Sequence, residues 1–140
     1  MALTNEVIYQ KSSQELTALL YEGMMNNLEQ AIELIEKKDF IQSNQKLQKS
    51  NDILKRLGIG LKYEAGPIAE QLDTLYNYLA NQLITANIKK DISIIKNVLE
   101  IIEVLAKAWN EALKTKSNAP LTNRMKQMTA YDSHVMRTQN

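Results

Sequence analysis

Few side chains in this sequence could carry out chemistry, and none belongs to a recognisable catalytic or metal-binding pattern. The single histidine, His134, has no acidic partner at ligand spacing, and the chain has no cysteine. A di-iron bundle needs Glu-x-x-His motifs on inward helix faces, and the sequence has none. Phosphate-binding loops of the GxxxxGK[ST] or GxGxxG type are also absent. We therefore predict that the protein is not an enzyme and needs no metal and no cofactor.

Charge and composition limit the classes of partner. The formal net charge is +1, so no strong overall field attracts nucleic acid or lipid headgroups. Basic residues gather in 46–62 and in the C-terminal tail, but no aromatic residues are interleaved within 46–62 to stack on bases. The most apolar stretch, 92–105, is interrupted by polar residues and is too short to span a bilayer. Residues 1–6 show no signal-peptide pattern, so we expect a cytoplasmic protein without nucleic acid or membrane insertion.

Apolar residues recur three and four positions apart along four segments, which predicts an all-α, antiparallel four-helix bundle over residues 12–115. Ser12 and Glu15 have capping-box spacing at the start of the first helix. The short link Lys37-Lys38-Asp39 requires the first two helices to be antiparallel, and an acidic first helix beside a basic second helix suits that pairing. Gly66-Pro67 opens the third helix, and Asp91 caps the fourth. The predicted helices cover residues 12–37, 39–62, 66–86 and 91–115.

Each of the first three helices has an apolar stripe that we expect to line the core. The stripe of the second helix is thin because Ser43 and Ser50 interrupt it. In the first helix the stripe consists of Leu16, Leu20, Met24, Leu28, Ala31 and Ile35. In the second it consists of Phe40, Leu47, Leu54, Leu57 and Leu61. In the third it consists of Ile68, Leu72, Leu75, Leu79, Leu83 and Ala86.

The fourth helix is apolar over a wider arc than a bundle helix needs. Its apolar positions cover roughly 220° of the helix circumference, against about 100° for an ordinary surface helix. The main stripe consists of Ile95, Val98, Ile102, Leu105, Trp109 and Ala112. Ile94, Ile101 and Val104 lie beside this stripe on one flank. We therefore expect the fourth helix to be central in the bundle, to face a partner, or both.

Both ends of the chain lack the regular pattern of the bundle. Residues 1–11 form a short N-terminal cap segment with at most one helical turn around Val7, Ile8 and Tyr9. This segment is a candidate cover for the apolar flank of the fourth helix when no partner is bound. Residues 116–140 are polar and contain Pro120, and we expect a flexible C-terminal tail.

Three groups of residues resemble the sequence signatures of the flagellar export chaperones of the FliS type. Leu16–Gly23 resembles the family's LI-x-x-LYDG run. Leu75–Leu79, followed by Leu83–Asn87, resembles its LY-x-Y-(M/L)…L-x-x-AN signature. Asp91, followed by the stretch Ile95–Val98 and then by Ala108-Trp109, is similar to its closing D…EV…L-x-x-AW pattern. The resemblance covers about residues 8–115. It departs from the family in three places, with one N-terminal aromatic residue, Ser12-Ser13 in place of a proline, and a longer tail.

The resemblance implies a function that composition and periodicity do not supply. Members of the family bind the C-terminal segment of flagellin, prevent its premature polymerisation and present it to a component of the flagellar export gate, without ATP. An amphipathic client helix could dock on the extra apolar arc of the fourth helix. The candidate client-binding residues are Ile8, Tyr9, Tyr21, Tyr76, Tyr78, Asn87, Ile94, Ile101, Val104 and Trp109.

Each candidate also has an ordinary structural explanation. The three tyrosines at 21, 76 and 78 could pack at the rim of the core with their hydroxyls in water. Trp109 could belong to the core, and Asn87 could be the C-cap of the third helix. Ile94, Ile101 and Val104 could be buried by the first or second helix, or by a homodimer. The alternative to a flagellin chaperone is a helical adaptor or homodimerising bundle for another secretion or signalling partner.

Overall fold

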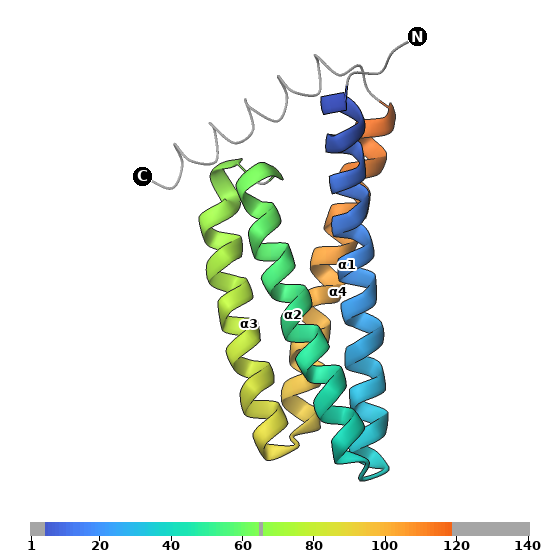
Figure 1. The fold of residues 1–140 in the computed structure, drawn as a ribbon, viewed down its shortest axis with the longest axis vertical. Coiled ribbons are helices and arrows are strands. Elements are labelled where there is room, and N and C mark those ends of the chain that lie inside the picture. The colour runs from blue at the N-terminus through green and yellow to red at the C-terminus, as the bar shows by residue number, and fades with distance from the viewer. Residues whose placement is uncertain (1–4, 65, 119–140) are drawn as a thin grey trace. The chain divides into compact units, whose positions relative to one another are not determined.

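The computed structural model describes the backbone of residues 5–64 and 66–118 and the side chains of residues 13–61 and 66–115. The elements are α1 (Asn5–Glu36), α2 (Phe40–Glu64), the 3₁₀ helix η1 (Gly66–Ile68), α3 (Ala69–Lys89) and α4 (Ile92–Asn118), as Figure 1 shows. These residues contain no strand. The prediction of an all-α four-helix bundle is confirmed.

The chain divides into two compact units between Lys107 and Ala108, although the backbone of α4 is helical on both sides of the division. The first unit contains α1, α2, α3 and the part of α4 up to Lys107. The second unit begins at Ala108, and its described part is the rest of α4, which ends at Asn118. The predicted C-terminal tail, 116–140, is helical up to Asn118 and otherwise lies outside the described residues, as do residues 1–4.

The boundaries of two helices differ from those predicted. Helix α1 begins at Asn5 rather than near Ser12, so residues 5–11 continue the helix and Ser12 does not cap it. The hydroxyl of Thr17 donates a hydrogen bond to the carbonyl of Ser13 (3.2 Å), as a residue in a helix interior does. Pro67, predicted to open the third helix, lies in η1 directly before α3, after Gly66, whose φ of 53° suits a glycine.

The buried stripes of α1 and α3 are shifted from the predicted ones at their outer ends. In α1 the stripe reaches Tyr21, whereas Leu16 is 48% exposed and Leu20 is half-buried. In α3 it reaches Tyr76, and the predicted Leu75 is half-buried. The buried residues of α1 are Tyr21, Met24, Leu28, Ala31 and Ile35, and those of α3 are Tyr76, Leu79, Leu83 and Ala86. Both shifts arise because a tyrosine, rather than the adjacent leucine, continues the three-and-four spacing.

Two serines complete the thin stripe of α2. Ser43 and Ser50 are fully buried and share one face of the helix with the buried leucines 47, 54, 57 and 61. The Ser43 hydroxyl donates to the carbonyl of Phe40 (3.1 Å), and the Ser50 hydroxyl donates to that of Lys46 (3.0 Å). Because these bonds satisfy both hydroxyls inside their own helix, the serines occupy core positions without an unpaired polar atom.

A three-residue turn joins α1 to α2. The amide of Lys38 donates to the carbonyl of Ile35 (2.9 Å), and the amide of Asp39 donates to that of Leu34 (2.8 Å). These two bonds define a Schellman motif, in which the residue before the last amide has a left-handed conformation. Lys38 occupies that position with φ 62°, where glycine is usual. The Asp39 carboxylate then accepts a hydrogen bond from the Gln42 amide (3.2 Å) and caps α2 as predicted.

The turn from α3 to α4 has the same Lys-Lys-Asp sequence and a similar conformation. Lys90 is left-handed with φ 54°, and the amide of Asp91 donates to the carbonyl of Ala86 (3.0 Å). The Asp91 carboxylate accepts hydrogen bonds from the amide (2.9 Å) and hydroxyl (2.6 Å) of Ser93, which confirms its predicted role as a cap. The Ser93 hydroxyl bond holds the pKa of Asp91 below its ordinary value. Both turns therefore end one helix and start the next within three residues.

Helix α2 packs beside α1 on one side and α3 on the other (Figure 1). Towards α3, the side-chain amide of Asn87 donates to the side-chain carbonyl of Asn44. Fourteen residues, or about four turns, further along α2, a Cβ atom added at Gly58 would lie 3.6 Å from the Asp73 carboxylate. The two pairs fix an antiparallel register, because positions fourteen apart on α2 face positions fourteen apart on α3.

We predict that Lys38→Gly stabilises the protein by about 0.5–1 kcal/mol, because glycine removes the left-handed penalty of about 1–2 kcal/mol but loses more chain entropy on folding. Urea unfolding measures this difference. Lys37→Gly is the matched control, since Lys37 has no positive φ, and it should give no gain. A loss of stability in Lys38→Gly would contradict the assignment of the turn.

We predict that acid weakens the wild-type protein more than Asp91→Asn. The pKa of Asp91 is lower in the folded state, so its carboxylate stabilises the fold above its ordinary pKa and loses that effect as pH falls through the folded value. Asparagine also caps helices but does not titrate. Unfolding free energies measured between about pH 6 and pH 2.5 should converge for the two proteins at the acid end. Ser93→Ala should reduce the pH dependence, and an unchanged dependence would contradict the role of that hydroxyl.

Candidate functional site

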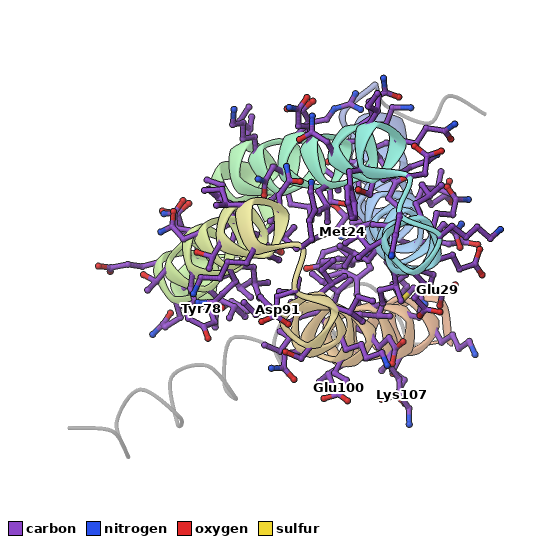
Figure 2. The ribbon with its side chains drawn as sticks, turned by 90° about the horizontal axis from the view of Figure 1, so that it is seen from below. Met24, Glu29, Tyr78, Asp91, Glu100 and Lys107 are labelled. Carbon is purple, nitrogen blue, oxygen red and sulfur yellow. The ribbon has the colours of Figure 1, made fainter. Side chains whose placement is uncertain are left out.

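Tyr21 and Tyr76 lie in the core rather than at its rim. Each is 3% exposed, and their hydroxyls form a hydrogen bond with one another. Viewed along the helices, α1 and α3 lie on opposite sides of the bundle, and Met24, one turn after Tyr21, points into the space between them (Figure 2). The bond therefore crosses the core and satisfies two phenols where water is excluded. The prediction of water-exposed hydroxyls is wrong for these two tyrosines.

Asn87 links two helices instead of ending one. Helix α3 continues to Lys89, and Lys90 is its C-cap. The Asn87 amide group donates to Asn44 of α2, while its carbonyl oxygen accepts a hydrogen bond from the Lys90 ammonium. The predicted C-cap role is therefore wrong, because the side chain bridges α2 and α3 at the end of the bundle where the two turns lie.

Four of the candidate residues retain accessible apolar surface on one side of the bundle. We call Tyr78, Ile94, Ile101 and Val104 the α3–α4 strip. Tyr78 is 52% exposed and Val104 is 68% exposed, and the two isoleucines are half-buried. On α3, Tyr78 lies on the flank opposite the one that faces α2, towards α4 (Figure 2).

The part of α4 inside the first unit separates a buried stripe from this strip. Its fully or almost fully buried residues are Ile95, Val98, Ile102 and Ala106. Ile94 and Ile101 precede two of these residues directly, so they lie on one flank of the stripe, and Val104 lies still further from it. Glu100 and Lys107 lie about one turn before and after Val104 on the outward side of α4 and point away from the bundle (Figure 2). The bundle therefore buries only part of the wide apolar arc predicted for this helix.

The remaining candidate residues are not brought to the strip by any described contact. Trp109 is half-buried and belongs to the second unit. Ile8 and Tyr9 lie in α1, but their side chains fall outside the described ones. Their client-binding roles, and the role of residues 1–11 as a cap, stay predictions.

Four glutamates of α1 form no ion pair with the basic residues of α2 whose side chains the structure describes. Glu15, Glu22, Glu29 and Glu36 lie seven residues apart and are all exposed, and Glu29 points outward in Figure 2. Among the side chains that the structure describes, none of these carboxylates forms an ion pair with a lysine or arginine of α2. The expected charge complementarity of the first hairpin is therefore not made by direct salt bridges, and the hairpin is held by its apolar stripes and its turn.

The described part of the molecule has no feature of a reactive site. No group of three or more histidine, aspartate or glutamate side chains within it could hold a metal ion. No helix among the described residues is long and apolar enough to cross a membrane. What this surface offers a partner is apolar area on a rigid helical frame.

Comparison with known proteins identifies the family. The profile described as "Flagellar protein FliS" matches residues 2–116. The chain belongs to the FliS family. It is similar to proteins named "Flagellar secretion chaperone FliS" from Bacillus subtilis (28% identity over 73% of this chain and 76% of the relative), Vibrio cholerae (31%, 71% and 74%) and Salmonella typhimurium (30%, 71% and 76%). FliS is a family of chaperones and not of enzymes, which confirms both the resemblance and the prediction that the protein is not an enzyme.

Sequence reasoning missed the tyrosine pair and several exposed apolar residues. A signal for the pair was present, since Tyr21 and Tyr76 each continue the three-and-four spacing of their stripe. Ile41 and Ile88 did not stand out, because Ile41 lies at the start of a helix and Ile88 lies between the predicted third and fourth helices, 66–86 and 91–115. Both side chains are more than three-quarters exposed, at 77% and 78%.

We predict that Tyr21→Phe and Tyr76→Phe each destabilise the protein by about 0.5–1.5 kcal/mol, because the remaining hydroxyl loses a buried partner. The double variant should lose less than the sum of the two single changes, and urea unfolding gives the coupling energy. Tyr78→Phe is the matched control, since its hydroxyl lies on an exposed residue, and it should stay within about 0.5 kcal/mol of wild type. Additive losses would contradict the hydrogen bond across the core.

Proposed function

We propose that this FliS-family protein is a cytoplasmic chaperone that binds the C-terminal segment of flagellin, prevents its premature polymerisation and delivers it to the flagellar export apparatus. Membership of a family of flagellar secretion chaperones supports the general role. The flagellin client and the export apparatus follow from the family resemblance. Binding through apolar contacts needs no nucleotide, which agrees with a sequence that lacks phosphate-binding loops.

One observation carries the proposed binding site. Val104 remains 68% exposed, whereas Ile95 and Ile102 in the buried stripe of the same helix have no exposed surface. Soluble monomers rarely leave contiguous apolar surface without a use for it. Tyr78 extends this surface onto α3. Its apolar ring and polar hydroxyl suit a contact whose edge remains exposed to solvent.

The shape of the strip favours a helical client segment. Ile94, Ile101 and Val104 follow the axis of α4 at intervals of seven and three residues. An amphipathic helix presents anchors at i, i+3, i+4 and i+7, so it could lie along such a row. A segment that is disordered when free loses conformational entropy when it binds. A small bundle can offset this cost only if it offers the segment a long contact area.

The buried candidates act in this proposal as supports. Tyr21 and Tyr76 join α1 to α3 through the core, and Asn87 joins α3 to α2. These bonds fix the position of α3, and therefore of Tyr78, so that the strip is preorganised before a client arrives. Preorganisation reduces the entropic cost of binding.

We predict that Val104→Gln and Ile101→Gln each weaken binding of a labelled flagellin C-terminal peptide about tenfold, because they place a polar group in an apolar contact. Fluorescence anisotropy measures the dissociation constant. Ile59→Gln is the matched control, as Ile59 is similarly exposed (64%) but lies on α2, and it should bind as wild type does.

A scrambled peptide completes this experiment. It should bind far more weakly than the native peptide to the unmodified protein. Equal binding of both peptides, or binding of neither, would rule out the flagellin chaperone. An adaptor or homodimerising bundle would then be the better description, and the oligomeric state measured by light scattering would separate those two.

A further inference from the structure

The side of α2 that faces α3 carries asparagine and glycine where a helix contact usually carries apolar residues. Positions 44, 51 and 58 are seven residues apart and therefore lie on one side of the helix. The first is bonded to α3 and the third lies beside it, so the second, midway between them, also faces α3. We call this contact the α2–α3 seam, which consists of Asn44, Asn51 and Gly58 on α2 and Asp73, Ala80 and Asn87 on α3.

The middle of the α2–α3 seam contains a polar atom without a partner. The side-chain oxygen Oδ1 of Asn51 is buried, and no donor among the described residues bonds to it. The register places Ala80 opposite, and the methyl group of alanine has no donor to offer. A buried amide oxygen without a hydrogen bond is destabilising, and contact with water relieves the loss. This layer of the seam therefore favours an open arrangement in which water reaches Asn51.

Two glycines weaken α2 just beyond this layer. Gly58 and Gly60 lie in the interior of the helix, where glycine loses more chain entropy than alanine does. Neither has a positive φ. A Cβ atom added at Gly60 would have no described atom within 4 Å, and one added at Gly58 would make an ordinary contact of 3.6 Å with Asp73. Packing therefore does not require either glycine, and their effect is to make this part of α2 easier to unwind.

The opposite end of the seam is held much more firmly. The side-chain carbonyl of Asn44 accepts a hydrogen bond from Asn87. The Lys90 ammonium bonds to Asn87 and also lies over the Phe40 ring, 5.8 Å from its centroid. At the weaker end, Ile68 occupies the N-cap position of α3, and no side-chain hydrogen bond caps the helix there. The contact between α2 and α3 is therefore strongest beside the turns and weakest at the other end.

We propose that α2 opens locally from α3 between Asn51 and Leu61, while residues 40–50 stay packed. Opening brings water to the Asn51 oxygen and allows the helix to unwind at its glycines. The Tyr21–Tyr76 bond joins α1 to α3 without involving α2, so it can persist while α2 opens. The bundle then has a built-in unit of low local stability, as binding proteins commonly do.

This opening uncovers apolar surface that is hidden in the closed bundle. The leucines of the opening part of α2 are 8% exposed or less, and they are Leu54, Leu57 and Leu61. None of them belongs to the α3–α4 strip, so the proposal concerns a different part of the molecule. It does not depend on flagellin being the client.

Hydrogen exchange of the full-length protein measures the opening directly. We expect the backbone amides of residues 52–61 to exchange at least about tenfold faster than those of residues 43–50 in the same helix, with a weaker dependence on urea. Gly60→Ala should slow exchange in 52–61 about fivefold, because alanine favours the helix. Gln45→Ala is the matched control, since Gln45 is exposed in the firmly held half, and it should leave that exchange unchanged.

A single introduced thiol gives a second measurement, because the chain has no cysteine. Leu61→Cys should react with iodoacetamide at least about tenfold faster than Leu47→Cys, whose position lies in the firmly held half. Adding Gly60→Ala to Leu61→Cys should slow the reaction about fivefold. This comparison at one position removes the small difference in exposure between the two leucines. Circular dichroism checks that each variant is folded.

Substitutions at Asn51 test the unpaired oxygen. Asn51→Leu should slow exchange in 52–61 several-fold, because a side chain of similar size leaves no polar atom in the seam. Asn51→Asp should speed that exchange, because a buried charge favours the open state still more.

Three results would overturn the proposal. They are equal exchange along the whole of α2 with one urea dependence, no slowing by Gly60→Ala in either measurement, and faster exchange in Asn51→Leu. The last result would show that the Asn51 oxygen has a bonded partner, such as a buried water, in the closed bundle. Failure of the flagellin titration would reject the proposed function and leave this proposal unaffected.

Discussion

The bundle covers only part of the apolar surface of α4, and this limit determines which of its side chains remain available to a partner. The apolar arc of α4 is wider than the stripe that the bundle buries, so Ile95 and Ile102 are enclosed while Val104 remains exposed. Filling the core and leaving a surface for a partner are thus accomplished by one helix. The wide apolar arc of α4, which is a property of the sequence, thus leaves the exposed apolar surface that a chaperone needs for binding another protein.

A small bundle can keep apolar surface exposed only if its own fold is stable. In this protein, polar contacts as well as apolar stripes stabilise the fold. The Tyr21–Tyr76 bond crosses the core, the Asn44–Asn87 bond sets the α2–α3 register, and two turns end and restart helices within three residues. Each contact satisfies polar groups that would be costly if buried alone. Together they place α3 so that one edge joins the α3–α4 strip.

The sequence predicts the helices well because three-and-four spacing and turn chemistry are local properties. Asp39 and Asp91 were recognisable as caps from their places beside apolar periodic segments. The positions of Tyr21, Tyr76 and Asn87 were not, because each depends on a partner in another helix that local patterns do not reveal. A tyrosine at a stripe position is equally compatible with rim and core until its hydroxyl finds a buried acceptor. The site is predictable in part. The wide apolar arc of α4 is visible in the sequence, but the position of Tyr78 beside it depends on how α3 packs in the bundle.

Site-specific photo-crosslinking to the flagellin C-terminal segment tests whether Val104 lies in the client contact. A photoreactive residue is placed in turn at Val104 and at Ile59, which are similarly exposed but lie on α4 and α2. The account predicts an efficient crosslink from position 104, mapped by mass spectrometry to the apolar face of the client helix, and little from position 59. Equal crosslinking from both positions, or none from position 104, would contradict it.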